Sequence, residues 1–380
     1  QIFNGIDAQH YKPYGYGINS FFNGKDIFFP TEIIHGLYDG GHGAGLDDYW
    51  NLMLQNPLSA GAFLWCFVDE GVVRTDKNGI IDTDGNHAPD GILGPYREKE
   101  ASFFTIKEIW SPVYINRKSI TEQFNGQLEV ENRYFYTNLN QCTFEWKLAD
   151  FPLPSENNTS KKIVSSGRQT GPSLKPGHRG VISLNLPDGW YKRDVFILTA
   201  KDPNGNEIMT WNWPLQKPAA IAKKIVPKES SKAPEVSENK IFITVNANGI
   251  EYTFDKSLGV LNTVSNKNGR ISFSDGPKIA HVDATYKELK HYKKGNNYIV
   301  EVITEGGFDF ARWTIMGNGW SKLEYAYGQH GEFDFMGANF SYPEDQVNGV
   351  RMLSNRPYRV WKNRMKGMNI GVWDKPYNNT

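Results

Sequence analysis

The chain has 380 residues, which is enough for two or three domains. Lys and Arg together number 42, as do Asp and Glu, so the formal net charge is +0. This balance argues against a nucleic-acid-binding protein, which normally carries an excess or a patch of basic residues. No apolar run approaches the ~18 residues that a membrane span needs, so none is expected.

Aromatic residues make up 14% of the chain. Flat rings stack against sugar faces, but they also fill the cores of β-rich folds, and we expect the second role to account for most of them. Cys66 and Cys142 fall in different predicted domains, so two buried thiols are expected in place of a disulfide. Gln1 opens the chain without Met or a signal peptide, so we expect any targeting segment to have been removed or not included.

Residues 1–111 alternate short apolar strands with helical patterns. Strands are predicted at residues 2–7, 26–33 and 62–68, and helices from about residue 46 and over residues 101–110, before Pro112. Such alternation implies a parallel sheet with covered faces. Three strands cannot close a barrel, so we expect the C-terminal part of a (β/α)8 TIM barrel, with the chain beginning inside that domain.

The rest of the chain is predicted to be all-β. Residues 112–217 have alternating strands such as 128–135 between regularly spaced turns, a pattern typical of an immunoglobulin-like β-sandwich. Residues 218–238, rich in Lys, Pro, Ser and Glu, are predicted to be a linker. Residues 239–380 form a second all-β domain, which we expect to be incomplete because no closing strand follows residues 368–373.

Glu32 is the principal candidate for a catalytic residue. It stands at the C-terminal end of the predicted strand 26–33, and His35 follows three residues later. In a (β/α)8 barrel, the chemistry takes place at this end of the strands. Retaining hydrolysis of a glycosidic bond needs two carboxyl groups about 5–5.5 Å apart, and Glu32 suits the role of nucleophile. A Glu here could also cap the next helix or form a surface ion pair.

Three further side chains follow strand ends near this position. Tyr11, after the first strand, is placed to donate a hydrogen bond that keeps Glu32 ionised. His35 could contact a sugar hydroxyl, and Trp65 could form an apolar wall for the sugar ring. Each residue alone is more often a packing or structural group, and only their convergence on consecutive strand ends favours a site.

Residues 82–86 place oxygen ligands at alternating positions, as a calcium loop does. With Asp82 first, however, the twelfth position is Leu93 in place of Glu. An Asx-rich turn is therefore preferred, and no metal site is assigned to the chain. We expect His87 and Asp90, in the same loop, to border the pocket.

These segments resemble glycoside hydrolase family 2 in its β-galactosidase-like branch. Residues 32–35, the Gly-rich turn and residues 48–50 resemble the nucleophile segment of that family. Residues 61–70 are similar to its next strand, and the segments 84–86 and 90–92 to the loop that follows. Further along, residues 350–364 resemble part of its C-terminal β-supersandwich, a galactose-mutarotase-like fold. The resemblance covers nearly the whole chain in the family's order.

The resemblance implies a role for each candidate. Glu32 would be the catalytic nucleophile and Tyr11 the residue that hydrogen-bonds it, and the substrate-binding residues would be His10, His35, Trp65 and Asp90. Cys66 and Phe67 stand where the family usually has Asp and Trp, a departure that leaves strict galactose specificity and the family's sodium site open.

The implied protein is a retaining exo-β-glycosidase that hydrolyses terminal β-linked sugars from oligosaccharides or polysaccharides. Its acid/base Glu and its ligands for a divalent cation, Mg²⁺, are expected upstream of these residues, so no cofactor is assigned to this chain. The expected partners are the saccharide substrate and the remainder of the same polypeptide, and the chain could also form a homo-oligomer. By analogy with the family, the location would be periplasmic or secreted. The alternatives are a non-catalytic carbohydrate-binding fragment, and a β-glucuronidase or β-mannosidase in the same fold.

Overall fold

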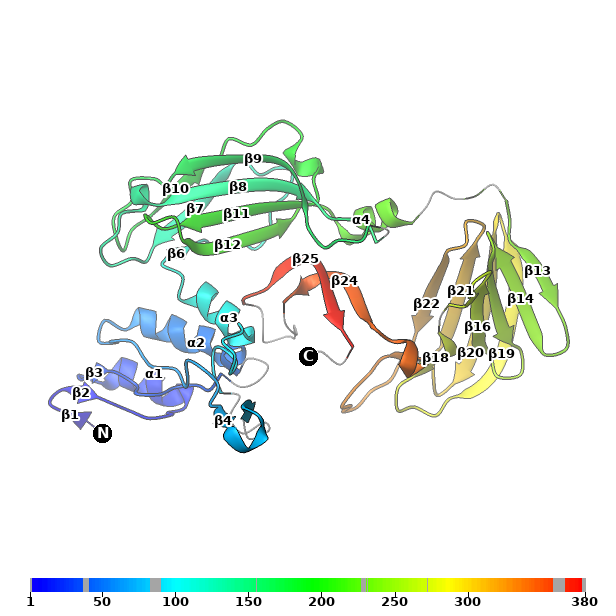
Figure 1. The fold of residues 1–380 in the computed structure, drawn as a ribbon, viewed down its shortest axis with the longest axis horizontal. Coiled ribbons are helices and arrows are strands. Elements are labelled where there is room, and N and C mark those ends of the chain that lie inside the picture. Colours follow the sequence, from blue (N-terminus) through cyan, green and yellow to red (C-terminus); the bar gives the residue numbers. More distant parts are fainter. Residues whose placement is uncertain are drawn as a thin grey trace. The chain divides into compact units, whose positions relative to one another are not determined.

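The computed structural model describes residues 2–36, 41–82, 90–154, 156–226, 230, 232–271, 273–357 and 366–377. Figure 1 shows the elements of the chain in order. Two compact units can be distinguished. Unit 1 comprises Gln1–Ile221 and Gly349–Thr380, and unit 2 comprises Ala222–Asn348. Among the described residues, no helix is both long and apolar enough to cross a membrane.

The first part of unit 1 alternates strands and helices. Its elements are β1 (Ile2–Phe3), β2 (Ile6–Asp7), α1 (Tyr14–Asn23), β3 (Ile27–Phe28), α2 (Gly41–Gln55), β4 (Val72–Arg74), η1 (Thr75–Lys77), β5 (Ile80–Asp82) and α3 (Ala101–Ile109). Strand β2 pairs with β3 in parallel, with Ile6 opposite Ile27. Single parallel bridges extend this arrangement, for example from Phe28 to Ser59. Parallel neighbours need a crossover connection, which α1 provides between β2 and β3. Strands and helices thus alternate as predicted around β2 and β3. The predicted strand 2–7 is instead the antiparallel hairpin β1–β2, and the predicted strand 62–68 contains only isolated bridges, at Trp65 and Val68.

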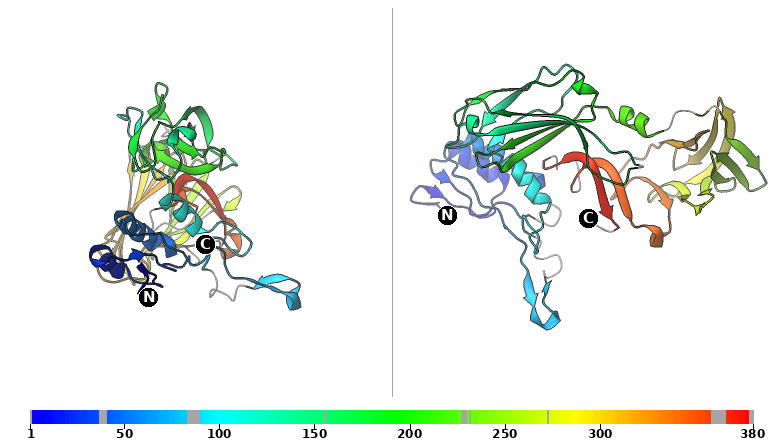
Figure 2. Two further views of the ribbon diagram at one scale, coloured as in Figure 1. Left: turned by 90° about the vertical axis from the view of Figure 1, so that its left-hand side faces the viewer. Right: turned by 45° about the horizontal axis from the view of Figure 1, so that its top comes forward.

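Helices α2 and α3 pack together and cover these segments. Leu46 of α2 is fully buried, and Ile33, Ile106 and Ile109 form a buried cluster with it. Helix α3 ends at Ile109, before Pro112, as predicted, whereas α2 begins five residues before Leu46. The β4–β5 hairpin, light blue in Figure 2, extends away from the rest of the first part.

Residues 113–214 form an antiparallel β-sandwich, called the first sandwich below. One sheet has the order β10-β7-β6 and the other β12-β11-β8-β9. The strands are β6 (Val113–Tyr114), β7 (Gln127–Asn132), β8 (Thr143–Asp150), β9 (Lys162–Thr170), β10 (Arg179–Ser183), β11 (Val195–Lys201) and β12 (Glu207–Pro214), with η2 (Leu139–Gln141) and η3 (Trp190–Lys192) between them. In β7, Leu128 and Val130 are buried while Gln127 and Glu129 are exposed, which confirms the predicted alternation.

Asn132 closes β7 with a fully buried side chain. Its amide nitrogen donates to the carbonyl oxygens of Thr137 at 2.9 Å and Leu174 at 2.8 Å. Its amide oxygen accepts from the backbone N–H of Tyr134 at 3.0 Å. Asn132 therefore satisfies three buried backbone groups, for which water is not accessible.

Strands β24 (Gly349–Arg356) and β25 (Asn369–Pro376) form a hairpin that belongs to unit 1. Its side chains Leu353, Ile370 and Val372 pack against a buried cluster that includes Phe151 and Val195 of the first sandwich. The predicted domain boundaries stay predictions, but this hairpin, grouped in the sequence with residues 239–380, contacts the first sandwich. Within the predicted linker, Pro218–Ile225 is the helix α4.

Unit 2 is a second antiparallel sandwich. One sheet runs β13-β14-β15-β16-β18-β23 with β17 paired to β16, and the other runs β19-β20-β21-β22. The first sheet contains β13 (Glu235–Glu238), β14 (Phe242–Ala247), β15 (Ile250–Asp255), β16 (Val260–Asn266), β17 (Gly269–Arg270), β18 (Ser274–Ile279) and β23 (Ala338–Ser341). The second contains β19 (Thr285–Lys294), β20 (Asn297–Glu305), β21 (Phe310–Met316) and β22 (Ser321–Ala326), and η4 (Glu344–Gln346) follows β23. Ile243, Val300 and Ile315 are fully buried between the sheets.

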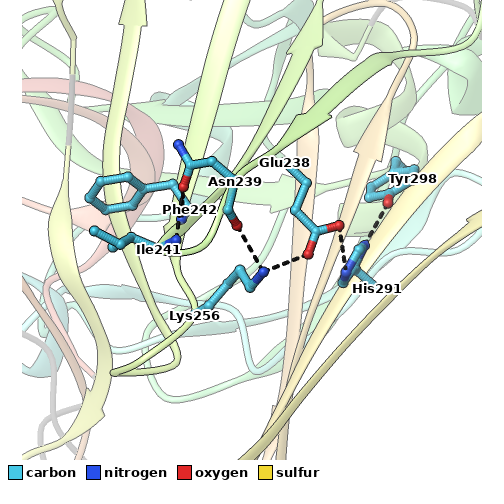
Figure 3. Close-up of polar contacts among 7 residues, drawn as sticks. All are labelled: Glu238, Asn239, Ile241, Phe242, Lys256, His291 and Tyr298. Atoms are coloured by element: carbon cyan, nitrogen blue, oxygen red, sulfur yellow. Dashed lines mark hydrogen bonds and ion pairs between the residues drawn. The ribbon is translucent and has the colours of Figure 1, made fainter.

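Polar side chains also link the two sheets of unit 2 (Figure 3). Lys256 Nζ donates to Glu238 Oε1 at 2.6 Å, and this hydrogen bond lowers the pKa of the Glu238 carboxyl. The other Glu238 oxygen lies 3.6 Å from Nε2 of His291 on β19, whose Nδ1 is hydrogen-bonded to the Tyr298 hydroxyl at 2.7 Å. When His291 is protonated, the pair joins β13 to β19 across the sandwich.

Candidate active site

The backbone of unit 1 brings all six predicted site residues to the ends of neighbouring segments. His10 and Glu32 form a parallel bridge, and the Tyr11 N–H donates to the Glu32 carbonyl at 2.8 Å. His35 and Trp65 form the next parallel bridge along the chain. Because the carboxyl ends of parallel strands meet at one edge of a sheet, side chains that follow these strands converge there.

The segment around Asp90 completes this edge. The Gly36 N–H donates to the carbonyl oxygens of Trp65 at 2.9 Å and Asp90 at 2.8 Å, and the Cys66 N–H also donates to Asp90 O at 3.0 Å. A Cβ atom at Gly36 would lie 2.2 Å from the carbonyl oxygen of Gly91. Only glycine therefore permits this close approach of two backbones.

Glu32 is enclosed but reachable. Its side chain is 23% exposed, and Oε1 lies 3.8 Å from Nδ1 of His10. His10 is 62% exposed, so protonation from solvent would turn this contact into an ion pair. Glu32 thus presents a carboxylate at the rim of the site, with a titratable group at its side.

Tyr11 lies between the two histidines. Its ring stacks on His35 with centroids 4.9 Å apart and meets the His10 ring edge-on at 4.6 Å. Burial, and then the neighbouring Glu32 carboxylate, raise the pKa of the Tyr11 hydroxyl. The hydroxyl is buried, yet it makes no hydrogen bond of ordinary geometry with the described residues. It is a neutral donor held next to a carboxylate.

His35 is oriented by Asp90. Its Nδ1 lies 3.2 Å from Asp90 Oδ1, and the two side chains are 40% and 17% exposed. Asp90 can fix the tautomer with the proton on Nδ1, which leaves Nε2 as an acceptor for a ligand. Trp65, the remaining predicted residue, is half-buried.

Two acidic residues near the site were not predicted as part of it. Asp69 is buried and accepts a hydrogen bond from the Gly91 N–H at 2.7 Å, so it holds the segment that carries Asp90. Glu100 precedes α3, and burial followed by the charges of Asp69 and Glu98 raises its pKa to about 7. The position of Asp69 directly after the apolar run 62–68 was the one sequence signal for it.

Only part of the predicted calcium-like loop lies within the described residues. Residues 83–89, which contain most of the calcium-like loop and His87, lie outside the described residues. In the part of the chain that the structure describes, no group of three or more His, Cys, Asp or Glu residues could hold a metal ion. The Mg²⁺ ligands, which are expected upstream of these residues, stay a prediction. Cys66 and Cys142 are free thiols, as predicted, but only Cys142 is buried, whereas Cys66 is half-buried.

Comparison with known proteins identifies relatives among the glycosidases, although no family model matches the chain. The β-galactosidase of Actinobacillus pleuropneumoniae is 23% identical over 255 residues, which cover 62% of this chain and 23% of the relative. That of Priestia megaterium (strain DSM 319 / IMG 1521) is 24% identical over 259 residues, with the same coverage. The chain thus matches under a quarter of the length of these relatives. The predicted resemblance to the β-galactosidase-like branch of glycoside hydrolase family 2 is confirmed.

Among solved structures, similar chains are those of the exo-chitosanase CsxA of Amycolatopsis orientalis. The complex of its E541A variant with PNP-β-D-glucosamine has a TM-score of 0.23 and 12% sequence identity, and the match covers 75% of this chain and 34% of that chain. The D469A complex has a TM-score of 0.23 and 11% identity, with the same coverage.

Proposed function

We propose that this chain is part of a retaining exo-β-glycosidase of the β-galactosidase type, with Glu32 as nucleophile. The observation that carries the proposal is the convergence of Glu32, His10, Tyr11 and His35 on one edge of the parallel segments. The similarity to bacterial β-galactosidases supports the same conclusion. We further propose that these segments are the last part of a (β/α)8 barrel, which matches their parallel pairing and intervening helices.

In the proposed reaction, a Glu32 carboxylate oxygen attacks the anomeric carbon of the terminal sugar. The bond to the leaving oxygen breaks, and a second carboxylic acid, expected outside these residues, protonates that oxygen. Water then attacks the anomeric carbon of the glycosyl ester, the acid/base removes its proton, and the free Glu32 carboxylate returns. Two inversions at the same carbon give overall retention.

The neighbours of Glu32 have distinct parts in this scheme. The Tyr11 hydroxyl, kept neutral by its raised pKa, is available to donate to the carboxylate and hold it in place. His35, oriented by Asp90, can accept a hydrogen bond from a sugar hydroxyl through Nε2. Trp65 and His10 would border the sugar, so that the pocket combines one flat apolar surface with a few polar groups.

The test is covalent trapping on the full-length polypeptide. A 2-deoxy-2-fluoro-β-galactosyl fluoride should label the peptide that contains Glu32, as mass spectrometry of a digest would show. Glu32→Gln should abolish labelling and lower the hydrolysis of 4-nitrophenyl β-galactoside by several orders of magnitude. The exposed control Glu122→Gln should retain both. Labelling of another carboxylate, or near-normal activity of Glu32→Gln, would exclude Glu32 as nucleophile.

Two alternative functions would give different experimental results. Faster turnover of aryl β-glucuronides or β-mannosides than of galactosides would indicate a different sugar specificity in the same site. Calorimetric binding of galactosides without turnover by the full-length polypeptide would indicate a non-catalytic carbohydrate-binding protein.

A further inference from the structure

A cavity of about 580 Å³ lies between the two sheets of unit 2. Its walls come from β16, β18 and β23 of one sheet, from β19, β20 and β21 of the other, and from the loop between β18 and β19. The volume falls within the ~300–1,000 Å³ that ligand pockets occupy. All lining residues belong to unit 2, whereas Glu32 belongs to unit 1.

The floor of the cavity is apolar and aromatic. Val260, Val302 and Phe308 line it and are buried. The Tyr286 ring lies directly against Gly259, where a Cβ atom would come within 2.5 Å of the ring. Gly259 therefore leaves room for the Tyr286 ring at the cavity wall. A floor of this kind suits the C–H face of a flat ring.

The rim of the cavity is polar, and several of its side chains have no hydrogen-bond or ion-pair partner among the described residues. His281, Asp283 and Asn339 are among the lining residues, and their exposed side chains form no hydrogen bond or ion pair with other described residues. Lys278, also on the rim, is paired with Asp275 at 2.6 Å. The rim thus offers free donors and acceptors above an apolar floor.

Two rim residues have left-handed backbone conformations. Asp275 has φ 55° and His281 has φ 58°, values that L-residues other than glycine seldom adopt. Such conformations are concentrated at ligand clamps and switch regions, where the surrounding structure holds them in place. Here they occur on the same rim, at the two ends of the segment that carries Lys278.

We infer that this cavity binds a neutral saccharide unit, with the apolar ring face on the half-buried Tyr286 ring and the hydroxyls on Asp283 and Asn339. The carboxylates of Asp275 and Asp283 outnumber the single ammonium group of Lys278, which disfavours an anion. The choice of a saccharide over another neutral polyol rests on the proposed function. The cavity would then be a second sugar site, separate from that of Glu32.

The test measures sugar binding to this 380-residue chain carrying Glu32→Gln. Binding is detected by saturation-transfer difference NMR. D-galactose, D-glucose, lactose and cellobiose are the probes, and inorganic phosphate is the anionic comparison. We expect at least one sugar to bind with Kd on the order of 1 mM. Asp283→Ala and Asn339→Ala should each weaken binding about 10-fold, the effect of losing a hydrogen bond to a buried ligand. Both side chains are exposed, so neither change should disturb folding.

Asp309→Ala, an exposed carboxylate of unit 2 that does not line the cavity, is the matched control and should leave binding unchanged. The inference is overturned if no sugar binds at tens of millimolar, if both cavity variants bind normally, or if phosphate binds more tightly than every sugar. The proposed function of Glu32 and the proposed sugar site in unit 2 can be refuted independently of each other. Hydrolysis by the full-length polypeptide carrying Asp283→Ala reports on Glu32, whereas the change in sugar binding that Asp283→Ala and Asn339→Ala cause in the Glu32→Gln chain reports on the cavity.

Discussion

Replacing Tyr11 with Phe should change stability and activity in opposite directions. The substitution removes only the hydroxyl, so the ring can keep its stacked position 4.9 Å from His35. That hydroxyl is buried and makes no hydrogen bond of ordinary geometry among the described residues, although it adjoins the Glu32 carboxylate. An unpaired buried hydroxyl costs about 1–3 kcal/mol in protein mutational data, so Tyr11→Phe should raise the free energy of unfolding by roughly 1 kcal/mol or more.

The same change should slow the proposed reaction. If the Tyr11 hydroxyl donates to the Glu32 carboxylate during catalysis, the hydrogen bond to a charged group contributes about 1.5–3 kcal/mol. Since about 1.4 kcal/mol corresponds to a factor of ten, kcat/KM should fall roughly 10- to 100-fold. A residue that served only in packing would show the gain in stability without this loss.

Two measurements separate these effects. Hydrogen exchange of peptides that cover residues 2–36 reports local stability, and initial rates with an aryl β-galactoside report kcat/KM. Tyr136→Phe is the control, because Tyr136 is 96% exposed and should change neither quantity. Unchanged activity of Tyr11→Phe, or a loss of local stability, would refute the reasoning about this hydroxyl.

Two further substitutions test the packing of unit 1. Burial and the charges of Asp69 and Glu98 raise the pKa of Glu100 to about 7 from 4.5, so its charged form destabilises the fold increasingly between these pH values. Glu100→Gln should therefore raise the free energy of unfolding by roughly 1–2 kcal/mol at pH 8, a value reduced for the screening of the charge by solvent, and leave it unchanged at pH 4. Thermal unfolding of both proteins at the two pH values measures this difference. An equal effect of the substitution at pH 4 and pH 8 would contradict the prediction. Asn132→Ala leaves three buried backbone groups unpaired and should lower the free energy of unfolding by roughly 3–5 kcal/mol, as measured by urea unfolding followed by tryptophan fluorescence. The exposed Asn204→Ala should change it by under about 0.5 kcal/mol, and a similar loss in both variants would argue against this role of Asn132.

Periodicity predicted the antiparallel parts of the fold well, because alternation along a strand directly reports which side chains are buried. The helix α1 was missed. Its sequence contains Gly15 and Gly17, which are weak helix formers, but a Cβ atom at Gly17 would lie only 3.4 Å from the Leu52 side chain. Close packing of α1 on α2 favours a small residue at position 17. A contact between two helices of this kind cannot be predicted from the local sequence pattern.

The candidate site was predictable where residues follow strands along the chain, as Tyr11, Glu32 and Trp65 do. The structure brings these residues together, whereas their catalytic roles stay predictions. Asp69 and Glu100 were not predicted because their surroundings depend on how the segment near Asp90 folds back. The hairpin β24–β25 shows a related limit, since alternation predicts strands but not the surface against which they pack.

The return of β24–β25 to unit 1 has a consequence for synthesis on the ribosome. The hairpin covers apolar side chains around Phe151 and Val195, but it is translated only after all of unit 2. Until then, the nascent first sandwich exposes an apolar patch that a chaperone could bind or that could promote aggregation. Pausing of translation within residues 222–348 should therefore lower the yield of folded protein more than pausing within the first sandwich, where this patch is not yet complete.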